Sequence, residues 1–396
     1  MTLDFHQISS QVNDMARAVA GKSSEKDELL ATARELLHAH ATDFDFLHGQ
    51  ITAAEKASEG VRFNWLGGAP VSEPLDATFA PPPTPDRATI IASDGSQIHP
   101  DQHAIALYFL VNVGIIAYRH GTKTTPDVHS AAELFFEDGD LLTEQGLLIS
   151  GSIVNAKRDV AEVGILAQFA PAYVADGTVI ALIDGQLTLH MMELSGKEQE
   201  QYRQSYLTHL ETLRAHGATI AAYIDRPRSG FVLSLLHIAN LGENITEYTL
   251  RHNPFIRLTD AQLFGDLPAG HRTAIFRQRS KANADYAKAG HAVHFFYLNT
   301  GSPDAPNITR VEIPEWVATN SDRLNTLHAM LLQQAAISGG YPYVLARAHE
   351  LAIIPPQERE ALETMLAVSL RKAGVRDVGV SRKQANKNAL RDDRRL

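Results

Sequence analysis

Three apolar stretches of the sequence each run into an aspartate. Asp94 follows "ATIIAS", Asp184 follows "VIALI" and Asp225 follows "TIAAYI". One aspartate-glycine pair after an apolar run most often marks a turn. Three such endings indicate more than turns, because in an open α/β sheet functional groups gather just beyond the carboxyl ends of the strands. Side chains that leave neighbouring strand ends can lie close enough together to share a metal ion, and the role of Asp225 stays open.

Carboxylates that converge in a chain without cysteine make a site for a hard cation. The sequence has no cysteine, which excludes disulfides, zinc-thiolate sites and thiol catalysis. Mg²⁺ or Mn²⁺ prefers oxygen ligands and accepts an imidazole. Two such ions about 4 Å apart would hold the attacking water and the leaving oxygen of a phosphodiester. The pattern therefore favours phosphodiester hydrolysis.

Two further residues are candidate ligands. Glu162 lies at the border of the apolar face of a helix predicted over 151–170, where an acid is usually just solvated. His349 lies about two turns into a helix predicted over 343–353, after the glycines and proline of "GGYPY". A histidine on such a face is usually structural. Beside a hard-metal site it would instead bind the ion or orient water.

The basic residues Lys157, Arg158, Arg226 and Arg228 lie close in sequence to these acids. They could hold the phosphates of a nucleic-acid backbone. The alternative is an ordinary solvated charge, and we favour that alternative for at least two of the four.

Strand-like and helical patterns alternate from Ala88 onward, which predicts an α/β sheet covered by helices. Apolar runs typical of strands cover 88–93, 104–118, 178–183, 219–224, 273–277, 291–298 and 308–313. Helical patterns cover 151–170, 196–216, 229–242, 319–338, 343–353 and 356–373. No helix separates the first two strand-like runs, so they form an antiparallel hairpin and the sheet is mixed.

Composition divides the chain into four segments. Residues 1–66 form a helical arm, whose stripe of leucines and alanines either packs on its own domain or pairs with a second copy. A proline-rich connector follows at 67–87. The principal domain spans 88–375. The basic tail at 376–396 is either a solvated terminus or a segment that contacts phosphate or a partner.

Length and charge limit the class of protein. The chain of 396 residues is 44% hydrophobic and carries a formal charge of −10, which argues against a generally basic protein that coats DNA. We see no apolar run of about 18 residues and no signal peptide. A cytoplasmic location is the simplest interpretation.

Three blocks together resemble the NurA-domain family of DNA-end-processing nucleases. They are "IIASDGSQ", "LIDGQL" and "GYPYVLARAHELAII", and the resemblance covers roughly Ala88 to Arg371. It implies a ribonuclease H-like core and a nuclease that depends on manganese or magnesium, with two ions. By position, the resemblance implies that the catalytic residues are Asp94, Glu162, Asp184, Tyr341 and His349. All of these except Tyr341 would also be metal ligands.

The same resemblance implies a biological setting. Family members act as 5′-to-3′ exonucleases and single-strand endonucleases in DNA end resection and double-strand break repair. They form homodimers that dock on a HerA-type hexameric ATPase that translocates DNA. Two features depart from the motif: Gln186 stands where the first block has Ser96, and Asp225 matches no motif position.

Two other functions remain open at this point. An actin-like ATPase shares the same sheet, but it cradles phosphates with Asp-x-Gly turns, and here glycine follows Asp94 and Asp184 directly. A catalytically inactive scaffold subunit of a translocase complex would lack one of the metal-binding acids. None of the expected acids is missing.

Overall fold

The computed structural model describes residues 5–21, 23–60, 63–143, 146–175, 177–189 and 196–375. The chain divides into two compact units, each built from two separated stretches. The first unit combines residues 1–84 with 222–341, and the second combines 85–221 with 342–396. This division differs from the linear order suggested by composition. The basic tail proposed at 376–396 lies outside the described residues.

The second unit contains a mixed sheet. Its strands are β3 (Ala88–Ile98), β4 (Phe109–His120), β5 (Asp127–Phe135) and β6 (Val179–Asp184). They lie in the order β6-β3-β4-β5. The pairs β3–β4 and β4–β5 are antiparallel and β3–β6 is parallel. The predicted hairpin between the first two strands is therefore confirmed, as is the mixed sheet.

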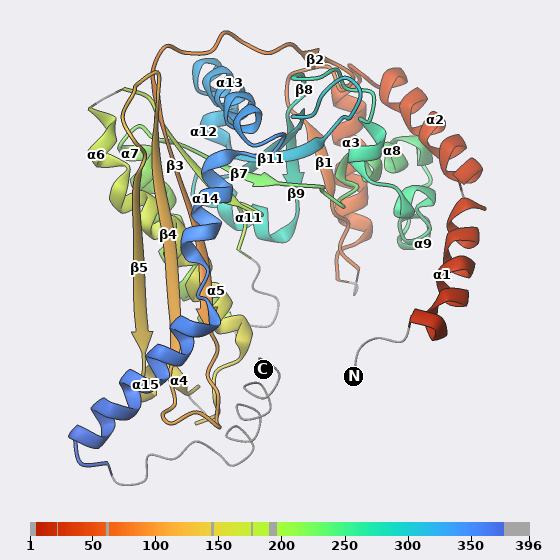
Figure 1. Cartoon of the computed structure of the whole chain (residues 1–396). Coiled ribbons are helices and arrows are strands. Elements are labelled where there is room, and N and C mark those ends of the chain that lie inside the picture. Colours follow the sequence, from red (N-terminus) through yellow and green to blue (C-terminus); the bar gives the residue numbers. More distant parts are fainter. Residues whose placement is uncertain are drawn as a thin grey trace. The chain divides into compact units, whose positions relative to one another are not determined.

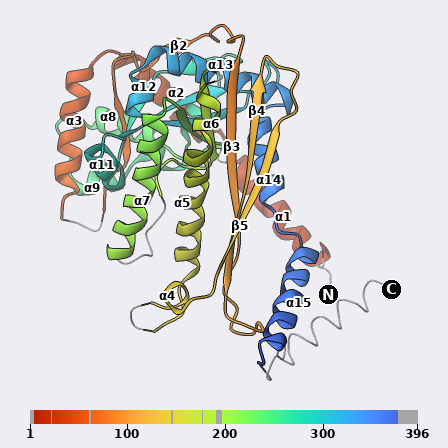
Figure 2. The same ribbon diagram turned by 90° about the vertical axis from the view of Figure 1, so that its left-hand side faces the viewer.

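Helices cover both faces of this sheet. Figure 2 shows α5 (Gly151–Phe169) and α7 (Gly196–Ala215) on one face and α14 (Tyr343–Ala352) on the other. Buried side chains of α5, including Val154, Val163 and Leu166, form its contact with the strands. This burial is what a helix with one apolar face requires. The remaining helices of the unit are α4 (Asp138–Leu141), α6 (Pro171–Val174) and α15 (Pro356–Lys372).

The first unit has its own strands and helices. Its strands are β1 (Gly67–Pro70), β2 (Thr78–Phe79), β8 (Arg272–Thr273), β9 (Phe276–Arg279), β10 (Val293–Asn299) and β11 (Ile308–Pro314), and β7 (Thr219–Ile224) spans the boundary between the units. Its helices are α1 (Phe5–Ala20), α2 (Ser23–Ala39), α3 (Phe44–Ala57), α8 (Phe231–Leu241), α9 (Glu247–Arg251), the 3-10 helix η1 (Pro254–Arg257), α10 (Asp260–Leu263), α11 (Lys281–Lys288), α12 (Glu315–Ala318) and α13 (Ser321–Ile337).

The N-terminal helices differ in how they pack. Ala33 and Leu37 of α2 and Leu47 of α3 are buried in the same apolar core as the residues of α8. The leucine stripe of α2 therefore packs on its own unit, which was the first of our two alternatives. By contrast, α1 leaves apolar side chains such as Phe5 and Met15 exposed. The proline-rich segment is not a simple connector, since it contributes β1 and β2.

Two strand boundaries differ from the prediction. The first strand does not end at Asp94 but continues to Ile98, because β4 keeps pairing with it as far as Leu110. The loss of apolar character at Asp94 marks instead the point where the parallel neighbour β6 ends. The second strand begins at Phe109 and not at residue 104. Among the described residues, no helix is both long and apolar enough to cross a membrane.

Candidate active site

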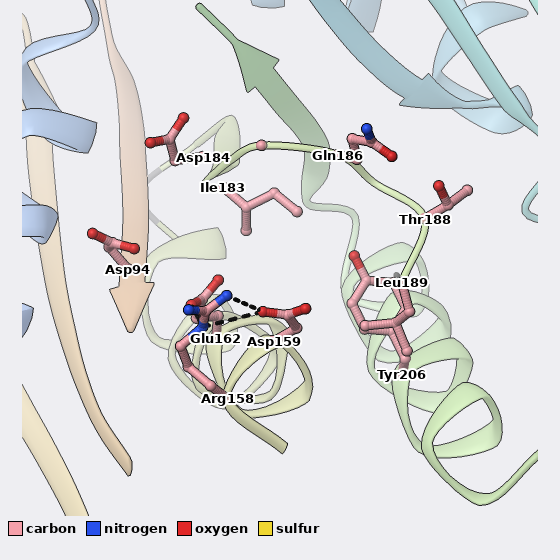
Figure 3. Close-up of a pocket in the computed structure, with 11 residues that line it drawn as sticks. Asp94, Arg158, Asp159, Glu162, Ile183, Asp184, Gln186, Thr188, Leu189 and Tyr206 are labelled. Atoms are coloured by element: carbon pink, nitrogen blue, oxygen red, sulfur yellow. Dashed lines mark hydrogen bonds and ion pairs between the residues drawn. The ribbon is translucent and has the colours of Figure 1, made fainter. Parts of the chain in front are cut away.

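Asp94 and Asp184 lie side by side at the end of the parallel strand pair. The last pair in that register is Ser93 with Ile183, and each aspartate is the next residue of its strand. Neighbouring strands are about 4.8 Å apart, so the two carboxylates start from adjacent positions. Both line a pocket of about 390 Å³, together with residues of α5 and α7 (Figure 3).

Glu162 completes the group of acids from the helix side. It is only 8% exposed, and its backbone carbonyl accepts a hydrogen bond of 2.9 Å from Ser93 Oγ, which fixes α5 against β3. Gly95 makes room for it, because a Cβ there would lie 2.6 Å from Glu162 Oε1. Burial raises the pKa of Glu162 well above its usual value, and the negative charges of Asp159, Asp94 and Asp184 add to this rise.

Arg158 partly neutralises these acids. Its guanidinium donates to Asp159 Oδ1 at 2.6 and 3.1 Å and to Gln97 Oε1 at 3.2 Å. It also forms an ion pair of 3.2 Å with Glu162. Figure 3 shows Arg158, Asp159 and Glu162 grouped on α5 beneath Asp94 and Asp184. Of the four basic residues that we considered as phosphate ligands, Arg158 is the one placed in this pocket.

His349 contacts the site from the opposite face of the sheet. Its Nδ1 lies 2.6 Å from Asp94 Oδ2, and its side chain is 64% exposed. It is therefore not a core histidine. The same helix is held at its end, because Ser96 and Asn112 both donate to the carbonyl of Ala352. The aspartate-glycine-serine block and the alanine-histidine block thus meet in space.

The donor chemistry of this pocket fits a divalent cation. The carboxylates of Asp94, Asp159, Glu162 and Asp184 face the single guanidinium of Arg158, which leaves a net negative charge on oxygen donors. Within the described part of the chain, no three acids or histidines are already arranged as a ligand set. One oxygen of Asp94 contacts His349 and one of Glu162 contacts Arg158.

The other predicted residues lie elsewhere. Tyr341 belongs to the first unit, where it lines a cavity of about 940 Å³ with Asp225 and Arg226. Its ring meets the ring of Tyr223 edge-on at 5.5 Å. Arg226 is 89% exposed and adopts a left-handed backbone with φ of 47°, which is uncommon for a side chain of this size. Arg228 is also exposed.

Lys157 has a structural role in the second unit. Its Nζ donates to Asp140 Oδ1 at 2.6 Å and lies 4.0 Å from the ring centre of Phe135. The ion pair and the aromatic contact tie α5 to α4 and to the end of β5. This placement supports the interpretation that some of the four basic residues do not bind phosphate.

Sequence reasoning missed two residues of the pocket environment. Gln97 orients Arg158, and it lies on the same face of β3 as Ser93 because side chains alternate along a strand. Continuing the first strand past Asp94 would have revealed it. Tyr206 of α7 lines the pocket and is 2% exposed. No local signal distinguishes it from any other buried tyrosine of a helix.

Comparison with known proteins identifies the family. The fold is ribonuclease H-like, with a mixed sheet flanked by helices. The family model described as "NurA domain" matches residues 88–354, so the chain belongs to the NurA family of nucleases. No curated protein matches the chain.

Comparison with solved structures gives matches at low sequence identity, of which the NurA nuclease has a TM-score above 0.5. The NurA nuclease from Sulfolobus solfataricus is 9% identical, with 94% of this chain and 98% of that chain covered and a TM-score of 0.51. The catalytic domain of human Endonuclease V is 11% identical, with coverages of 70% and 83% and a TM-score of 0.31. The RuvC structure from Thermus thermophilus is 14% identical, with coverages of 46% and 95% and a TM-score of 0.16.

Proposed function

We propose that this protein is a deoxyribonuclease that hydrolyses phosphodiester bonds with the help of Mn²⁺ or Mg²⁺. The observation that carries the proposal is the group of carboxylates around one pocket, formed by Asp94, Glu162 and Asp184 with Asp159 beside them. Burial raises the pKa of Glu162 well above its usual value, and the negative charges of Asp159, Asp94 and Asp184 raise it further. A site that concentrates negative charge in this way is suited to a divalent cation.

Asp94, Glu162 and Asp184 are the residues that would hold the metal. When bound, one or two such ions would supply a positive charge that polarises the phosphate and lowers the pKa of a water molecule. Arg158, already in the pocket, can turn from the acids to a phosphate oxygen of the substrate, for which a guanidinium is well shaped.

His349 is placed to handle a proton. Because Asp94 Oδ2 accepts from its Nδ1, the proton of the neutral ring is on Nδ1 and Nε2 is left as an acceptor. Nε2 can then orient a water molecule or accept its proton. This use of one ring nitrogen to fix the tautomer of the other is common beside metal sites.

We also assign the cavity of the first unit to the DNA strand. It combines the ring of Tyr341 with the exposed guanidinium of Arg226. An aromatic ring can stack on a base and an arginine can bind a phosphate, without a requirement for sequence. Arg228, two residues further on, would add a second positive charge.

Family membership supports a more detailed role. We propose a 5′-to-3′ exonuclease and single-strand endonuclease that acts as a cytoplasmic homodimer in DNA end resection and double-strand break repair, together with a HerA-type hexameric translocase. The metal of the cell would be manganese or magnesium. These details rest on membership of the NurA family.

The proposal is tested with labelled single-stranded and duplex DNA in Mn²⁺, in Mg²⁺ and in EDTA, beside an ATP hydrolysis assay. Asp94→Asn and Asp184→Asn should each lower cleavage by orders of magnitude while circular dichroism stays unchanged. Glu350→Gln is the control, because this exposed acid follows His349 and, among the described residues, forms its ion pair with the nearby Arg347. Hydrolysis of ATP alone, or full cleavage by both aspartate variants, would refute the proposal.

A further inference from the structure

The strand β5 forms an open edge of the second unit's sheet. It spans nine residues and pairs with β4 along its whole length. Within the described residues it pairs with no other strand, and Figure 1 shows it as the outermost strand of this sheet. One row of its backbone N–H and C=O groups therefore has no neighbouring strand to bond to.

Proteins usually protect such an edge, but several of the common protections are missing from β5 among the described residues. Exposed edges are typically blocked by lysine, proline, a bulge or a very short strand. The residues from Val128 to Glu133 are all exposed and include neither lysine nor proline. The register with β4 continues without a bulge. A long, regular and unprotected edge is a template for the addition of another strand.

We infer that a second copy of this chain pairs on this edge, β5 against β5, antiparallel about a two-fold axis at Ala131. The inference rests on the homodimer proposed above and adds where the two copies meet. Strands from the two copies would then form one continuous sheet. A two-fold axis perpendicular to the sheet keeps each side chain on its own face of the sheet. Because side chains alternate along a strand, paired residues must then be an even number of positions apart, so one residue lies opposite its own copy.

The sequence of β5 is complementary to itself about Ala131. In this register His129 of one copy lies opposite Glu133 of the other, and Val128 lies opposite Leu134. Asp127 lies opposite Phe135, but its carboxylate is already bonded to Arg119 and Tyr173 of its own copy. The residues nearest the axis are small (Ser130, Ala131 and Ala132), so the backbones can approach closely. Cross-strand pairs of charged or polar partners and of apolar side chains stabilise antiparallel sheets. With the axis at Ala131, two-fold symmetry makes the polar pair His129–Glu133 and the apolar pair Val128–Leu134 each occur twice.

Neighbouring registers lose this match. An axis at Ser130 places Asp127 opposite Glu133, which are like charges facing each other. An axis at Ala132 places His129 opposite Phe135 and leaves Glu133 opposite Ala131. The register centred on Ala131 is therefore the favoured one.

The strand is also rigid enough to serve as a template before a partner arrives. Asp127, its first residue, accepts hydrogen bonds from Arg119 at 2.6 Å and from Tyr173 at 3.1 Å. Phe135, its last residue, stacks on Phe109 with ring centres 4.4 Å apart. His129 lies against Phe169 at 5.2 Å. Because both ends are anchored, pairing costs little ordering of the strand.

The absence of cysteine allows a direct test by cross-linking. Opposed residues of antiparallel strands have Cα atoms about 4.5 to 5.5 Å apart, within the range of a disulfide. Ala131→Cys should therefore give a covalent dimer under mild oxidation of the full chain. Ser130→Cys is the matched control, since two cysteines there would lie about 8 Å apart, beyond disulfide reach. Equal cross-linking of both variants, or of neither, would overturn the inference.

A charge exchange tests the register. His129→Glu puts glutamates opposite each other and should shift light scattering from about twice the chain mass of 43.4 kDa towards one chain. The double variant His129→Glu with Glu133→Lys restores opposite charges and should restore the dimer. A dimer that is unaffected by His129→Glu, or that is lost on changing Phe5 and Met15 of α1 to serine instead, would contradict the β5 interface.

DNA cleavage by the unmodified protein is measured on the same preparations. If the protein cleaves DNA but does not cross-link at position 131, the proposed interface is wrong and the proposed nuclease activity stands. If the protein cross-links at position 131 but does not cleave DNA, the proposed interface is supported and the proposed nuclease activity is wrong.

Discussion

The imidazole Nδ1 of His349 lies 2.6 Å from Oδ2 of Asp94, although 255 positions separate the two residues in sequence. The contact depends on a glycine. Gly114 of β4 is the register partner of Asp94, and a Cβ at Gly114 would lie 2.6 Å from the carbonyl oxygen of Ala348. The backbone of α14 thus rests directly on the strand, and this close approach brings His349 to the aspartate.

Gly114→Ala should consequently damage both stability and activity. The added methyl group would meet backbone atoms of α14, which cannot rotate away as a side chain would. Displacing α14 should cost about 1 to 3 kcal/mol in unfolding free energy and should separate His349 from Asp94. Chemical denaturation and DNA cleavage measure the two effects.

Gly49→Ala is the matched control for that substitution. Gly49 lies inside α3, where a Cβ would meet nothing within 4 Å. Alanine there should stabilise the protein by about 0.5 to 1 kcal/mol and leave cleavage unchanged. If Gly114→Ala behaved like Gly49→Ala, the packing of α14 would not be what positions His349.

His349→Ala should separate catalysis from folding. Since the side chain is 64% exposed, its removal should change the unfolding free energy by less than about 0.5 kcal/mol. Loss of a group that orients or deprotonates water should lower the cleavage rate by about 10² to 10⁴-fold. Both quantities are measured on one preparation. A lowered melting temperature with normal turnover would assign His349 a structural role.

Metal binding should be visible without any turnover. An ion that binds only the folded protein stabilises it, by about 2.7 kcal/mol when its concentration is 100 times the dissociation constant. Mn²⁺ should therefore raise the melting temperature, and EDTA should reverse the effect. Asp184→Asn should reduce the shift, whereas Glu350→Gln should keep it. An equal shift in both variants would place the metal elsewhere.

The sequence predicted the regular elements well where burial leaves a pattern. The strand at 219–224 and the helix at 151–170 were located within one residue of their observed limits. By contrast, β5 was not predicted, because its exposed residues carry no apolar alternation. Its existence is fixed by pairing with β4, a tertiary contact.

The site was predictable in part for a similar reason. The acids Asp94 and Asp184 follow apolar runs, so their common location could be inferred from the order of strands. The ion pair of Lys157 with Asp140 could not, because it depends on how α4 packs beside α5. Asp225 also follows an apolar run, but it lines the cavity of the first unit, whereas Asp94 and Asp184 line the pocket of the second unit.

A buried histidine of the first unit, His328, should make the protein less stable in acid. His328 of α13 is 1% exposed, and its Nε2 lies 2.7 Å from the carbonyl oxygen of Gly270. Burial, with smaller contributions from Arg272 and His271, lowers the pKa of His328 to about 4. The folded protein therefore keeps this ring neutral at a pH where the unfolded chain would protonate it.

The sign of the effect follows from proton linkage. Between pH 6.5 and 4 the unfolded state binds more protons at this position than the folded state, so stability is complete above pH 6.5 and is lost as the pH falls towards 4. The loss from this group is at most about 3 kcal/mol. His328→Gln, which retains an N–H for Gly270, should flatten the dependence of unfolding free energy on pH in this window. His103→Gln is the control, because that side chain is exposed in the folded protein. An unchanged slope in His328→Gln would show that other groups cause the acid sensitivity.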